Sequence, residues 1–139
     1  MWIPMRRWIG ACAVVVSTFS LAHAHHSITG VYDTRREIAV DGVVTDFQFV
    51  SPHPFVLADV VRSGVAERWR LDMDDRSEMR EIGMTESTLR SGDRIAVAGN
   101  PARQDPHRLY IRRLERPLDG YAWEIVRSSP RLRARGATR

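Results

Sequence analysis

The sequence has almost no cysteine and no lysine. Its single cysteine, Cys12, lies in an N-terminal apolar run that we interpret below as a removable segment. Without that segment the chain can form neither an internal disulfide nor a cysteine-based zinc or nucleophile site. A chain of this length forms one small domain, and its stability must come from an apolar core.

A basic face is also missing from the body of the chain. Of the 21 basic residues, all arginine, two lie near the N-terminus and five lie in the last thirteen positions. Residues 25–126 therefore carry 14 arginines against 17 acidic residues. We expect no nucleic-acid partner, because such binding needs a basic folded surface.

Residues 1–24 have the pattern of a secretory signal peptide. Arg6 and Arg7 precede an apolar run, Trp8 to Leu21, that is too short to span a bilayer, and Ala22-His23-Ala24 is a small-x-small cleavage site. We predict an exported protein, periplasmic or secreted, with no transmembrane segment in the mature chain.

The predicted cleavage leaves two histidines at the new N-terminus. Cutting after Ala24 makes His25 the first residue and His26 the second, so His25 offers an amine and an imidazole for chelating a transition metal. A cut after Ala22 also satisfies the cleavage rule. The chain would then start at His23 with His25 third, which is a different Cu(II)- or Ni(II)-chelating arrangement.

Apolar alternation predicts a mainly β fold. Residues 37–50 read as a long first strand whose apolar residues change parity, which predicts either a bulge between Val44 and Phe47 or a bend at Gly42. A two-turn helix is expected from Asp75 to Gly83. Further strands are expected over residues 55–62, 66–73, 94–98 and 107–114, with a short last strand or strap over 121–125.

This order of elements predicts a small five-stranded OB-like Greek-key barrel with one short helix between strands 3 and 4. A sandwich-like variant is the nearest competitor. We place the domain at residues 25–126. Residues 127–139 contain arginine at alternate positions after Pro130. We expect them to form a disordered, solvated tail that can make weak contact with an anionic surface.

A metal site could form from His25, His26 and His53. His53 stands between Pro52 and Pro54, so its backbone is stiff. One distant imidazole added to the amine and imidazole of His25 makes a three-nitrogen set suited to Cu(II). Tyr32 or Asp33 could act as outer partners of such ligands.

Each of these residues also has a plain structural reading. The terminal histidines could be solvated, His53 could cap strand ends, and His107 fits an ordinary surface position. Trp69 is expected in the core. Asp72, Asp74 and Asp75 lack the spacing and the central glycine of a calcium loop, and they fit a helix start. No sequence motif of a nucleophile, phosphate or dinucleotide site occurs.

Several motifs resemble the DUF6152 family of small exported bacterial proteins. They are His25-His26-Ser27, Tyr32-Asp33, Gly42-Val43-Val44, Pro52-His53, Trp69, Gly83, Leu89-x-x-Gly92-Asp93, Gly99 and Pro117-x-Asp119-Gly120. The family typically has asparagine where this chain has Ser51, and tryptophan where it has Met84. The resemblance implies an exported β-rich domain and brings no established activity.

We therefore expect a monomeric, non-catalytic binding module that binds a transition metal through His25, His26 and His53. Copper is the favoured metal. The alternative is a metal-free interaction module that holds a peptide, an envelope partner or a small ligand. An enzyme is the third reading, and the sequence names no catalytic residue for it.

Overall fold

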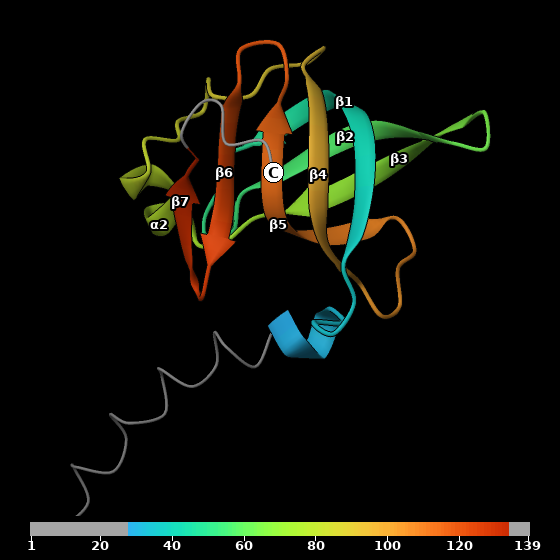
Figure 1. Cartoon of the computed structure of the whole chain (residues 1–139), viewed down its shortest axis with the longest axis horizontal. Helices are drawn as coiled ribbons and strands as arrows, with labels where there is room; N and C mark the ends of the chain where they lie inside the picture. Colours follow the sequence, from blue (N-terminus) through green and yellow to red (C-terminus); the bar gives the residue numbers. More distant parts are fainter. Residues whose placement is uncertain (1–27, 134–139) are drawn as a thin grey trace, which may run out of the picture.

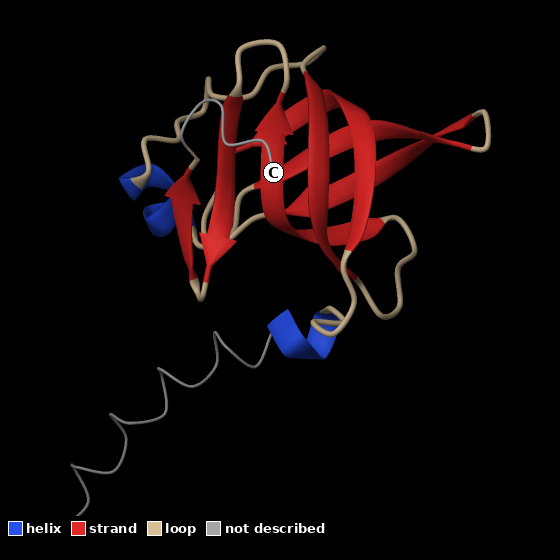
Figure 2. Ribbon diagram, viewed as in Figure 1, coloured by secondary structure: helices blue, strands red, loops and turns tan. Residues whose placement is uncertain are grey.

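The computed structural model describes residues 28–133 as seven strands and two short helical segments (Figures 1 and 2). A single helical turn covers residues 28–31. The other elements are β1 (Ile38–Gln48), β2 (Phe55–Arg62), β3 (Val65–Asp72), α2 (Arg76–Glu81), β4 (Arg94–Pro101), β5 (Arg108–Arg116), β6 (Tyr121–Val126) and β7 (Ser129–Leu132). The predicted signal peptide (1–24), His25, His26 and the last six residues lie outside the described part.

Five of the strands close into a barrel. The sheet runs β3-β2-β1-β4-β5, and β3 pairs with β5 in parallel to close it. The short α2 lies between β3 and β4, so the predicted OB-like Greek-key barrel is confirmed. Strands β6 and β7 extend the sheet beyond β5, outside the closed barrel (Figure 1).

The predicted bulge in β1 is present. The register against β2 shifts between Val44 and Asp46, which lets the chain turn both halves of its apolar pattern to one core. Val44 before the shift and Phe49 after it are both buried. Trp69 is also fully buried in this core, as predicted.

The helix α2 begins and ends for local reasons. The Asp75 carboxylate accepts a hydrogen bond from the Ser77 backbone N–H and caps the first turn. Met79 is its buried residue. Gly83, with φ at +87°, supplies the left-handed residue after the helix.

The tail prediction is wrong for the first part of the segment. Ser129–Leu132 forms β7 against β6, with Pro130 buried opposite Ile125. Arg127 turns the chain back with a positive φ of 60°. An edge strand tolerates Pro130 because its missing N–H can face away from the partner strand. Within residues 28–133, no helix has the length and apolar character to cross a bilayer.

Candidate functional site at the barrel seam

The site lies where β3 and β5 close the barrel. The parallel register pairs Arg70 with Arg108, Leu71 with Leu109 and Asp72 with Tyr110. Strand alternation puts the two leucines into the core, where both are buried. The other four side chains therefore share the opposite face of the seam.

Asp72 is the centre of this seam. Its carboxylate is buried, and the residue is 4% exposed. Arg70 Nε donates to Oδ1 at 2.8 Å, and Arg108 Nε donates to Oδ2 at 2.7 Å. The Tyr32 hydroxyl also donates to Oδ2, at 2.6 Å. Three donors thus satisfy a carboxylate that would be costly to bury alone.

Tyr32 belongs to the first described residues, 28–33, which we call the N-terminal segment and which lie against the seam. Tyr32 forms an isolated bridge with Ala102, and the Asp33 N–H donates to the Pro101 carbonyl at 2.9 Å. The Tyr32 ring lies 5.5 Å from the ring of Tyr110, in a tilted arrangement. Burial, then the bond to Asp72, raises the pKa of Tyr32 well above its ordinary value, so its hydroxyl stays a donor.

A cavity of about 350 Å³ opens beside this cluster. The N-terminal segment, the loop before β2 and the seam strands line it together. Its lining residues are Ile28, Val31, Tyr32, Val50, Ser51, Pro52, His53, Phe55, Arg70, Asp72, Met73, Arg108 and Tyr110. An apolar pocket with a few convergent polar groups is the usual form of a small-ligand site.

His53 enters the cavity from the loop between its two prolines. Its Nδ1 is buried and has no hydrogen-bond partner among the described residues. The pKa of the nearby Asp75 carboxyl is lowered, chiefly by the Ser77 hydroxyl and in smaller part by His53. Buried polar atoms usually have a partner, and among the residues lining this cavity His53 is the one with a buried side-chain nitrogen that residues 28–133 leave without one.

A family model described as a family of unknown function, DUF6152, matches residues 13–110, which is most of the chain. The chain belongs to the DUF6152 family. The match includes His53, the N-terminal segment and the seam residues up to Tyr110. It stops inside β5, so Pro117-x-Asp119-Gly120 and the two outer strands of this DUF6152 protein lie beyond it. A search of curated proteins finds no match.

The structure brings only some of the predicted site residues together. His53 and Tyr32 line the same cavity. Asp33 instead accepts from the Arg35 backbone N–H and lies 3.9 Å from Arg103. No cluster of three or more potential metal ligands of the His, Cys, Asp or Glu type occurs within residues 28–133.

His107 lies in a different environment from His53. Its ring is 5.6 Å from that of Trp69, and its Nε2 is 3.3 Å from a Glu67 carboxylate oxygen. These contacts agree with the ordinary structural role expected for it. His107 is therefore a suitable control position for His53.

Sequence reasoning missed the Arg70–Asp72–Arg108 cluster of this DUF6152 protein. It assigned Asp72 to the acidic start of the helix, whereas the residue ends β3 and faces the seam. The only sequence signal was polar residues at alternate positions of two strands, and it was weak because both strands carry other charged residues. Nothing in the sequence indicated that the two strands would be parallel neighbours.

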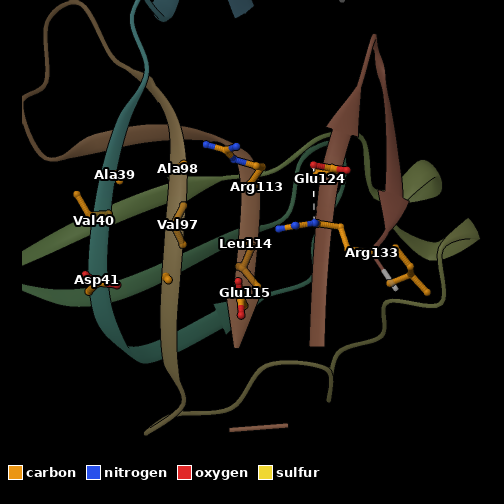
Figure 3. Close-up of a pocket in the computed structure, with 12 residues that line it drawn as sticks. Ala39, Val40, Asp41, Val97, Ala98, Arg113, Leu114, Glu115, Glu124 and Arg133 are labelled. Atoms are coloured by element: carbon orange, nitrogen blue, oxygen red, sulfur yellow. Dashed lines mark ion pairs between the residues drawn. The ribbon is translucent and has the colours of Figure 1, made fainter. Parts of the chain in front are cut away.

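A second, larger hollow of about 770 Å³ lies on the outer face of the sheet (Figure 3). Its floor contains Ala39, Ala96 and Ala98, and longer side chains surround them. Asp41, Arg113, Glu115, Glu124 and Arg133 line it as well, with Glu124 and Arg133 3.9 Å apart. The hollow arises because alanines face outward between residues with long side chains. No histidine lines it.

Proposed function

We propose that this protein is an exported, non-catalytic binding module that holds a transition metal ion, copper first, through His25, His26 and His53. The observation that carries the proposal is the position of His53. It lines the same cavity as Ile28, the first described residue, which follows His25 by three positions.

Chain geometry supports this arrangement. Three residues span at most about 11 Å. The amine and imidazole of His25 are therefore within covalent reach of a cavity whose wall includes both Ile28 and His53. This proposal is supported by the position of Ile28 and His53 on the wall of one cavity.

The donors also fit the chemistry of copper. An amine and imidazoles are nitrogen ligands, which Cu(II) binds most tightly among divalent first-row ions. The backbone around His53 is stiffened by Pro52 and Pro54, so little ordering is needed on binding. A metal ion, when bound, would give the His53 imidazole the partner that its buried Nδ1 lacks in the described structure.

The proposed setting is the periplasm or the exterior, and we infer a monomer. Export follows from the signal-like residues 1–24. The closed barrel is a scaffold that can hold an ion beside the N-terminal segment. We infer that the protein binds or buffers the metal ion and does not use it for redox catalysis.

The experiment is native mass spectrometry of the untagged, exported protein with and without one equivalent of Cu(II). We expect a chain beginning at His25 that retains one copper. Adding one alanine before His25 should weaken Cu(II) affinity more than tenfold, because the terminal amine moves away from the imidazole. Equal affinity of the parent and the extended chain would contradict the proposal and favour the metal-free interaction module.

A further inference from the structure

The arginines of the seam have more bonding capacity than Asp72 uses. Arg70 and Arg108 each donate to Asp72 through Nε, on one edge of the guanidinium. Their side chains are 39% and 34% exposed, against 6% for Asp72. The guanidiniums are thus fixed by a buried carboxylate while part of each remains open to the cavity that they line.

The charged groups lining the cavity sum to a positive charge. Two arginines stand against Asp72, and the pKa values of Tyr32 and Tyr110 are both raised, so these tyrosines are neutral. Three further acids lie near but do not line the cavity: Asp74 and Glu78 interact with Tyr110, and Asp75 interacts with His53. The open edge of the cluster therefore favours an anion.

Most of the rest of the wall is apolar, with Ser51 and His53 as its polar members. Phe55 lies under Arg70, with the guanidinium carbon 3.7 Å from the ring centroid, which holds the arginine in place. Ile28, Val50 and Met73 continue this wall. The volume of about 350 Å³ is at the small end of ligand pockets and equals roughly a dozen waters.

We propose that this cavity binds a small monocarboxylate with an apolar body. The carboxylate accepts hydrogen bonds from the open edges of Arg70 and Arg108, and the body packs against Phe55 and its apolar neighbours. Asp72 is the positioning residue, because it holds both guanidiniums before the ligand arrives. The proposed metal ligand His53 lines the same cavity, but the carboxylate contacts Arg70 and Arg108 and not His53.

Calorimetric titration of the mature chain with octanoate tests the proposal. Octanol serves as the neutral analogue, and EDTA in all solutions keeps the result independent of the metal proposal. We expect one octanoate per chain and at least about tenfold weaker binding of octanol, since charge-assisted bonds are lost. No octanoate binding, or equal binding of the two compounds, would overturn the proposal.

Arg70 variants locate the site. Arg70→Gln should lower octanoate affinity about tenfold or more, whereas Arg70→Lys keeps the charge and should lose less. Arg68→Gln is the matched control, since Arg68 lies on the same strand but pairs with Asp59 at 2.6 Å outside the cavity. An equal loss in Arg68→Gln and Arg70→Gln would contradict a defined site. Circular dichroism of each variant verifies the fold.

Discussion

The seam cavity and the outer hollow are two concave regions of one sheet, and the smaller one is lined by the buried polar cluster. The hollow is larger, and its charged lining residues Asp41, Arg113 and Glu115 are exposed. Their side chains are labelled in Figure 3. The seam places a buried carboxylate, two arginines and a histidine nitrogen with no hydrogen-bond partner among residues 28–133 around its cavity. The comparison teaches that the volume of a concave region is a poor guide to function. Buried polar groups that are held in place by hydrogen bonds are the better guide, because burying them is costly.

The largest contrast is expected between neighbouring residues of β4. A Cβ at Gly99 would lie 2.0 Å from the Tyr110 carbonyl oxygen, next to the seam. Gly99→Ala should therefore reduce the free energy of unfolding by about 3 kcal/mol, since backbone must move. Ala98→Val, on the floor of the hollow, should change it by less than about 1 kcal/mol.

Urea unfolding followed by tryptophan fluorescence measures both values. If Ala98→Val destabilised the protein as much as Gly99→Ala, the two regions would not differ in packing. A matched loss would remove the structural basis of the comparison.

A carboxylate in each region gives the next contrast. Asp72→Asn removes the charge that holds Arg70, Arg108 and Tyr32, and should cost about 2 kcal/mol, a value reduced by the partial exposure of the arginines. Glu115→Gln, at an exposed position by the hollow, should stay within about 0.5 kcal/mol. Denaturant unfolding at pH 7 measures both, and similar small changes would argue against Asp72 as the centre of the seam.

The tyrosines provide a pH test of the seam. Burial raises the pKa of Tyr121, outside the seam, to about 12, and raises those of Tyr32 and Tyr110 further. In the unfolded chain all three lose protons near pH 10 while the folded protein keeps them. The contribution of these tyrosines to stability should therefore be constant at neutral pH and fall as pH rises through about 10.

Tyr32→Phe removes one of these groups and should make the alkaline loss of stability less steep. Unfolding curves at pH 9, 10 and 11 compare the variant with the parent. The same pH dependence in both proteins would mean that Tyr32 is not buried in the seam as described.

Much of the barrel followed from local pattern. The parity change around Val44 predicted the bulge, and Asp75 followed by Gly83 predicted the short helix. These signals are local, because alternation and capping depend on residues a few positions apart. The arginine-rich segment after Val126 misled for the same reason, since its composition indicated a solvated tail although Pro130 packs at a strand edge.

The site depended on contacts that no local pattern contains. Asp72 meets Arg108, 36 residues away, only because β3 and β5 are parallel neighbours at the closure. Tyr32 reaches the same carboxylate from 40 residues away across the seam. The proline neighbours of His53 made it a candidate metal ligand in the sequence. Its position in one cavity with the N-terminal segment depends on the folded barrel and could not be predicted.

The measurement that tests the central claim most directly is the Cu(II) affinity of His53→Ala, obtained by competition with a chelator of known affinity. His107→Ala is the control, because His107 contacts Trp69 and Glu67 away from the cavity. The account predicts at least a tenfold loss for His53→Ala and parent-like affinity for His107→Ala. Parent-like copper binding by His53→Ala would contradict it.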